Sequence, residues 1–221
     1  MNDVAVWDGV TRSSTLLEDG VRVRGALADA ARHYEWEQML AILRKQPDYV
    51  NASRLDGRAR YAPLHQAASG NAPVDVIDEL IRLGAWRTLQ NAHGERAVDV
   101  AERKYRWHLR EILTPVLKRE VPHGVLHTVQ RHFHAVIRNR VASDVRAHKL
   151  RLPELEPLLE LDDPTVWFPV PGMYGGFRYV LARDGVSATL IAESWCSVVG
   201  GSGQRHEINA RGSRLVAEGF G

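Results

Sequence analysis

Apolar residues in the first half of the chain recur at steps of three and four, a spacing that predicts helices with one buried face. Three short segments rich in small residues, 25–31, 62–68 and 96–102, are each followed by a longer apolar stripe. The second segment begins 37 residues after the first, and the third begins 34 residues after the second. Matching apolar positions in the three segments are Leu27, Leu64 and Val98, and then Ala30, Ala67 and Ala101. The pattern predicts repeated helix pairs that stack on one another.

The pattern of apolar and polar residues changes in the second half of the chain. Residues 123–150 carry apolar side chains at helical spacing and predict one long helix. From Thr165 onward the pattern is typical of strands, with a hairpin signal at Asp184-Gly185 and a glycine-rich loop at 200–203. This part predicts an antiparallel meander of about four strands, with the long helix packed on one face.

The middle repeat has the most specific motif. Residues 62–68 read APLHQAA, Leu83-Gly84-Ala85 ends the second helix, and Asn91-Ala92-His93-Gly94 forms a turn before the next unit. Over about residues 23–117 the chain resembles ankyrin repeats. The resemblance implies stacked units, each with a short helix and then a longer one, whose finger loops and first helices bind a protein partner. It also implies that His65 hydrogen-bonds backbone groups and braces neighbouring units.

The predicted fold class is therefore α+β: a short ankyrin-like helical array, a long helix and a small antiparallel β-sheet. We expect an N-terminal segment at 1–22, the repeats at 23–117, and the helix with its β-meander at 118–221. The C-terminal region shows no motif by which we can name a family.

Composition fits an ordinary globular protein. Of the 221 residues, 44% are hydrophobic and 25% charged, which excludes a mainly disordered chain. No apolar run suits a membrane span, and residues 1–15 lack the pattern of a secretory signal. The single cysteine, Cys196, excludes an intramolecular disulfide and a Cys-rich zinc site. These features predict a cytoplasmic protein, and 25 Arg against 4 Lys is typical of a GC-rich bacterial genome.

The formal charge of +2 conceals two opposed segments. Residues 118–151 have a net charge of +6, and residues 152–164 have a net charge of −5. We expect the two segments to pair internally, so the basic helix does not favour a nucleic-acid partner.

His123 and His127 lie one helical turn apart, but no Glu accompanies them as in the stronger zinc motif, and no metal site is predicted. The sequence indicates no cofactor.

Candidate partner-binding residues lie in the two finger loops. Arginine and aromatic side chains are the types enriched at interface hot spots. The alternative is that Trp86 packs between units and the arginines are solvated. The candidates are Arg54, Arg58, Arg60, Tyr61, Trp86, Arg87, Asn91 and His93. We predict an interaction or adaptor protein that binds another protein through these loops.

The alternative function is a small-molecule-binding domain or an enzyme, with its pocket in the β region near Tyr174, Trp195, Cys196, His206 and Glu207. Cys196, His206 and Glu207 are the catalytic candidates, since a Cys nucleophile needs a base or a positive field. If Val199 pairs with Gln204, Cys196 stands opposite Glu207, but a slip or bulge would change this. The same aromatics could instead form the core. The proposed pocket is lined by Trp167, Tyr174, Phe177, Tyr179, Trp195 and His206.

Overall fold

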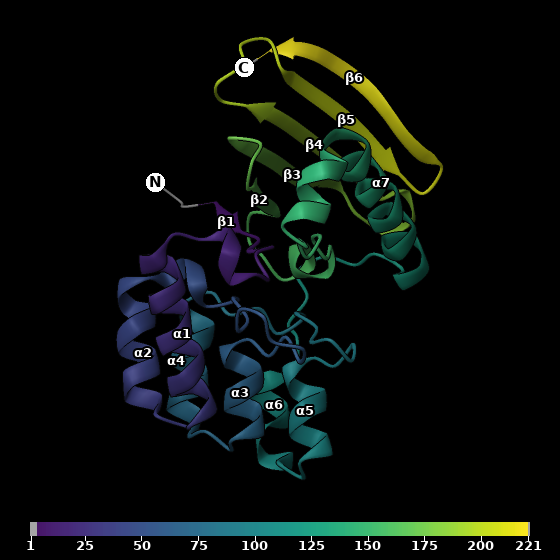
Figure 1. Cartoon of the computed structure of the whole chain (residues 1–221). Coiled ribbons are helices and arrows are strands. Elements are labelled where there is room, and N and C mark those ends of the chain that lie inside the picture. Colours follow the sequence, from purple (N-terminus) through teal and green to yellow (C-terminus); the bar gives the residue numbers. More distant parts are fainter. Residues whose placement is uncertain (1–3, 221) are drawn as a thin grey trace. The chain divides into compact units, whose positions relative to one another are not determined.

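The computed structural model describes residues 4–220 and confirms the predicted α+β class (Figure 1). The chain divides into two compact units. The helical unit runs from Thr11 to Val116. The sheet unit combines the residues up to Val10 with those from Leu117 onward. The predicted N-terminal segment at 1–22 is therefore divided, because its first part belongs to the sheet unit and its second part to the helical unit.

Six α-helices form the helical unit in two layers. The first layer stacks α1 on α3 and α3 on α5, and the second stacks α2 on α4 and α4 on α6. Helix α1 begins at Glu18, earlier than the predicted segment at 25–31. The helices are α1 (Glu18–Arg32), α2 (Trp36–Lys45), α3 (Pro63–Ser69), α4 (Val74–Arg82), α5 (Ala97–Arg103) and α6 (Arg110–Leu113), with short 3₁₀ turns at Ser13–Thr15, Pro47–Tyr49 and Trp107–Leu109.

The positions that align in the sequence are also equivalent in the core of the helical unit. Ala30, Ala67 and Ala101 are at most 1% exposed, and the matching Leu27, Leu64 and Val98 are buried as well. Alanine at the first set of positions lets the first-layer helices approach closely. The second-layer stripes supply Met39, Leu43, Ile77, Leu80, Leu109 and Leu113 to the same cluster.

A six-stranded sheet forms the second unit, in the order β1-β2-β3-β4-β5-β6. Strand β1 pairs parallel to β2, and every later pair is antiparallel. The meander therefore has five strands and not about four, and residues near the N-terminus supply a sixth. The strands are β1 (Ala5–Val6), β2 (Thr165–Val170), β3 (Gly175–Arg183), β4 (Thr189–Cys196), β5 (Gly203–Asn209) and β6 (Gly212–Phe220).

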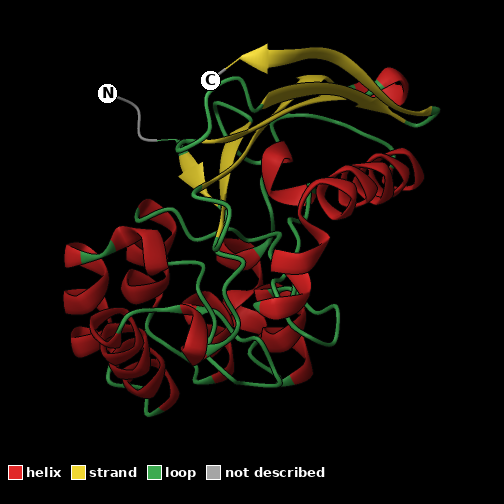
Figure 2. Cartoon of the chain, turned by 45° about the horizontal axis from the view of Figure 1, so that its top comes forward, coloured by secondary structure: helices red, strands yellow, loops and turns green. Residues whose placement is uncertain are grey.

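Helix α7 (His123–Ala147) packs on one face of this sheet, as Figure 2 shows. It contributes Val129, Phe133 and Ile137 to a core that also contains Phe177 and Tyr179. The helix is not continuous, since Val141 has φ −140° and ψ 39° and interrupts it. After α7 the chain forms a 3₁₀ turn at Glu156–Leu159.

The short N-terminal strand is anchored well inside the sheet unit. Trp7 is 2% exposed, and its indole N–H donates to the carbonyl of Arg151 at 2.9 Å. The Arg151 guanidinium lies over the indole ring, 5.0 Å from its centroid. Gly9 is required here, because a Cβ would stand 2.6 Å from the Phe168 ring and 2.8 Å from the Arg151 carbonyl. These contacts bind the start of the chain to the sheet.

Candidate functional site

The loop between α2 and α3 presents three exposed arginines. Arg54, Arg58 and Arg60 are all exposed, whereas Tyr61 at the end of the loop is half-buried. Arg54 is partly held by Asp29, with 2.5 Å between guanidinium and carboxylate. Arg60 has φ 53°, an uncommon conformation for a non-glycine residue, so the loop has a defined shape at its arginines.

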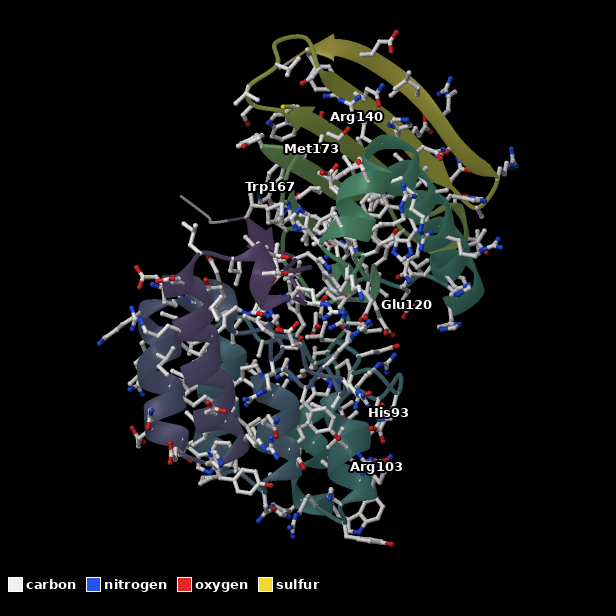
Figure 3. All side chains as sticks on the ribbon, in the orientation of Figure 1. His93, Arg103, Glu120, Arg140, Trp167 and Met173 are labelled. Atoms are coloured by element: carbon white, nitrogen blue, oxygen red, sulfur yellow. The ribbon has the colours of Figure 1, made fainter. Side chains whose placement is uncertain are left out.

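The two finger loops are bonded to each other. The Ala92 amide donates to the Ala59 carbonyl at 3.0 Å, which joins the loop tips. The Arg103 guanidinium donates to the Tyr61 hydroxyl and to both oxygens of Glu95. Hydrogen bonds from Arg103 and then Asn91 hold the pKa of the Glu95 carboxyl below its usual value. His93 is exposed at the tip of the second loop, and Figure 3 labels it together with Arg103.

His65 joins the middle helix pair to the next loop. Its Nδ1 accepts a hydrogen bond from the Ala62 amide at 3.4 Å, and its Nε2 lies 3.1 Å from the Glu95 carbonyl. Since Nδ1 is the acceptor, Nε2 is the nitrogen that donates to this carbonyl. The side chain is 1% exposed and braces two successive units, as the resemblance implied for this position.

Three of the predicted binding residues have structural roles instead. Trp86 is 5% exposed, and its amide donates to Asn51 Oδ1 at 2.9 Å. Arg87 is half-buried, and its Nε donates to the Ile112 carbonyl at 2.9 Å. Asn91 is 5% exposed, and its Oδ1 accepts from the amides of His93 and Glu95. The predicted residues that remain accessible are the exposed Arg54, Arg58, Arg60 and His93 and the half-buried Tyr61, which together we call the finger surface.

A groove beside the finger surface lies between α1, the first finger loop and α3. Three of its lining residues are arginines and none is acidic. Arg24 at its base is 2% exposed and donates to the Ser53 carbonyl at 2.5 Å. The groove is lined by Arg24, Leu27, Ala28, Ala31, Arg32, Ala52, Ser53, Arg54, Tyr61, Pro63 and Gln66. This side of the helical unit therefore combines positive charge with small apolar surfaces.

The aromatic residues predicted to line one pocket in the β region lie on different sides of the sheet. Phe177 and Tyr179 are at most 1% exposed and belong to the core beneath α7. Trp167 and Trp195 pack together on the opposite face with ring centroids 5.0 Å apart, and Figure 3 labels Trp167. Tyr174 lies in a loop and is 71% exposed. The predicted pocket does not form, because alternate strand residues face opposite sides.

The catalytic candidates are separated as well. Gln204 pairs with Ser194 and not with Val199, so the assumed register was wrong. His206 stands opposite Ala192, whereas Glu207 is on the other face, opposite Ile191, and pairs with Arg214 at 2.8 Å. The register differs because residues 197–202 form a longer loop, in which the Ser202 hydroxyl binds the backbone of Cys196. Cys196 gains neither a base nor a carboxylate by this arrangement.

A polar cleft that the sequence did not reveal opens between α7, β5 and β6. It gathers Asn139 and Arg140 from the helix with Gln204, His206 and Ser213 from the strands. Burial and then the charge of Arg140 lower the pKa of His206 below its usual value. Of this set only His206 was among the predicted site residues. The strand pairing that assembles the cleft joins residues too far apart to be read from periodicity.

The predicted ion pairs between the basic and the acidic segment form beside the long helix and not along it. Lys118 pairs with Asp162, and Arg151 pairs with Glu154, but both basic residues lie outside α7. Two of the histidines in α7 contact backbone carbonyls: His132 contacts that of Asn209 at 2.9 Å, and His134 contacts that of Pro153 at 2.7 Å. Within residues 4–220, no group of three or more His, Cys, Asp or Glu is placed to hold a metal ion.

No helix within the described part of the chain has both the length and the apolar character needed to cross a membrane.

No protein-family model matches the chain, and no curated protein matches it. One similar solved structure is a predatory endopeptidase from Bdellovibrio bacteriovorus in complex with an immunity protein. The match has 28% sequence identity and covers 39% of this chain and 42% of that chain, with a TM-score of 0.33. This chain thus matches less than half of that chain's length, and the score does not establish a shared fold.

Proposed function

We propose that the helical unit is an ankyrin-like array that binds another protein, so that the chain serves as an interaction or adaptor protein. The observation that carries the proposal is the finger surface, on which Arg54, Arg58 and Arg60 stand exposed in a loop of defined shape. Arginine is enriched at interface hot spots because its guanidinium combines several donors with a stackable plane.

The hydrogen bonds between the loops favour recognition by a preformed surface. The Ala92–Ala59 bond and the Arg103 contacts with Tyr61 and Glu95 fix the loops relative to each other. A surface that is already ordered loses less conformational entropy on binding. The partner can therefore bind without first ordering the two fingers.

Charge indicates the kind of partner. Arg58 and Arg60 are exposed, and Arg24, Arg32 and Arg54 line the adjacent groove, in which no lining residue is acidic. A partner segment with acidic side chains would complement this side of the unit, and association would slow as salt rises. The salt dependence distinguishes such a partner from one that binds through apolar contacts.

The test compares two charge-reversed double variants. Arg58→Glu with Arg60→Glu changes the finger surface, whereas Arg22→Glu with Arg82→Glu makes the same charge change at exposed helical positions elsewhere on the unit. Proteins retained by the wild-type chain are quantified by mass spectrometry, and the strongest partner is then purified and titrated by calorimetry. We expect the finger variant to weaken binding about tenfold or more and the control variant to change it little.

Unchanged binding by both folded variants would contradict the proposal. An equal loss of binding in both variants would contradict it too, because it would indicate attraction to net charge and not to the finger surface. Circular dichroism of each variant establishes that the helical unit is folded before binding is compared.

A further inference from the structure

The polar cleft of the sheet unit has the size of a ligand site and is lined mainly by polar groups. It is open to solvent, has a volume of about 370 Å³ and lies between strands β5 and β6 and residues 136–140 of α7, just before the interruption at Val141. Small-molecule sites commonly occupy a few hundred Å³ and combine apolar walls with a few polar groups. We propose that this cleft binds a small organic anion, with its carboxylate or phosphate on Arg140 and its apolar part against Val136 and Leu215.

Arg140 supplies the positive charge that selects an anion, and Figure 3 shows its position on α7. One of its nitrogens donates to the Ser202 carbonyl, which orients the guanidinium and leaves other N–H groups for a ligand. No carboxylate in the described residues lies within ion-pair distance of Arg140, and none lines the cleft. Arg103, Arg178 and Arg205, by contrast, each pair with a carboxylate.

Neutral polar groups surround this charge. Asn139 and Gln204 contribute amides, Ser213 contributes a hydroxyl, and His206 contributes an imidazole. Since burial and Arg140 both depress the pKa of His206, the ring is neutral at pH 7 and can donate through one nitrogen. Each of these four groups can donate a hydrogen bond to an oxyanion, and none of them carries a repelling negative charge.

The apolar part of the lining restricts the ligand further. Val136 is 5% exposed and forms the floor, and Leu215 is 43% exposed at the edge of the sheet. A bare inorganic anion would leave both side chains unused. An anion with an aliphatic or aromatic arm would cover them and gain apolar burial.

The backbone beside Arg140 provides an independent observation. Val141, the next residue, leaves helical geometry at φ −140° and ψ 39°, although residues 139–145 contain neither Pro nor Gly. Sharp interruptions of a helix usually have such a residue as their cause. Beneath the cleft, the Ser194 hydroxyl is buried opposite Gln204 and has no hydrogen-bond partner within residues 4–220. Local irregularity and an unused polar group are more frequent at binding sites than in ordinary cores.

Four six-carbon probes test the proposal on the full chain. Hexanoate and hexyl phosphate carry the two oxyanions, 1-hexanol carries no charge, and hexylammonium carries the opposite charge. Binding is followed by heteronuclear NMR titration, with the amide signals of residues 203–215 as the reporters. We expect saturable binding of at least one anion at these signals and none of the alcohol or the amine. The stronger of the two anions identifies whether carboxylate or phosphate is preferred.

Three variants locate the site. Arg140→Gln should weaken anion binding about tenfold, since it removes a charged hydrogen-bond donor. Asn139→Leu changes an exposed residue and should also weaken binding, so it serves if Arg140→Gln disturbs the Ser202 loop. Arg138→Gln removes the same charge from an exposed position two residues earlier and should leave binding unchanged. Equal binding of hexanoate and hexanol, equal loss in Arg138→Gln, or no saturable binding of either anion would overturn the proposal.

Discussion

The helical unit and the sheet unit close their cores over very different distances along the chain. In the helical unit, His65 reaches the Glu95 carbonyl across 30 residues, which is about one repeat. In the sheet unit, Trp7 reaches the Arg151 carbonyl across 144 residues. When one repeat of a stack is weakened, mainly the contacts with its neighbouring repeats are lost. When a contact between two segments remote in sequence is lost from a sheet, both segments lose the contact that holds them in place.

The largest effect should come from the remote contact. Trp7→Ala removes a side chain that is 2% exposed, together with its hydrogen bond to Arg151. We expect the free energy of unfolding of the sheet unit to fall by about 3–5 kcal/mol. Urea denaturation measures the loss, and hydrogen exchange assigns it to one unit. Trp107→Ala is the matched control, because Trp107 is 57% exposed; equal destabilisation by the two variants would contradict the role of Trp7.

A medium effect is expected from the contact between neighbouring units. His65→Ala leaves the Ala62 amide and the Glu95 carbonyl without the imidazole that both contact. The cost should be about 1–3 kcal/mol, confined to the helical unit. Hydrogen exchange should show faster opening around residues 62–103 and unchanged protection in β2–β4. The control His93→Ala alters an exposed loop tip and should change stability by less than about 0.5 kcal/mol. Loss of protection spread over both units would remove the distinction between them.

The smallest effect concerns acid: it has the same sign in both units, but it begins at a higher pH in the sheet unit. Burial lowers the pKa of His134 below its usual 6.5, so its stabilising effect is complete above that value and is lost as pH falls below it. The lowered pKa of His206 acts in the same direction. In the helical unit the Glu95 pKa is lowered from 4.5, so its contribution persists until pH falls below that value.

Between pH 7 and pH 5 the sheet unit should therefore weaken while the helical unit keeps its stability. Unit-resolved hydrogen exchange across this range, corrected for intrinsic exchange rates, measures the difference. His134→Gln can retain a donor to the Pro153 carbonyl and should flatten the pH dependence of the sheet unit. A sheet unit as resistant to pH 5 as its neighbour would show that His134 does not control this dependence.

The same difference in contact distance explains what could be predicted. Ala30, Ala67 and Ala101 could be placed in one core from their spacing alone, because each repeats the environment of the last. The pairing of Ser194 with Gln204 could not, since a hairpin register depends on the loop between the strands. That loop is shaped by the Ser202 side chain, which composition does not reveal.

For the same reason, only some of the site residues could be predicted from the sequence. Exposed loop arginines such as Arg58 follow from local sequence, whereas Trp86 and Asn91 look like surface residues until their buried contacts are seen. Arg140 and His206 come from separate elements and meet only through tertiary packing. Periodicity identifies the face of an element, but it does not tell which two faces will enclose a cleft.

Strand β1 also has a consequence for the order in which the protein is made. Ala5 pairs with Val166, so the whole helical unit is synthesised between the two partners. The first strand must wait unpaired while the helices emerge, and it can pair only after β2 has left the ribosome. A cut after Val116 would separate Trp7 from Arg151. Removing the inserted helices while keeping Trp7 and Arg151 in one chain would require a linker from residue 10 to residue 117.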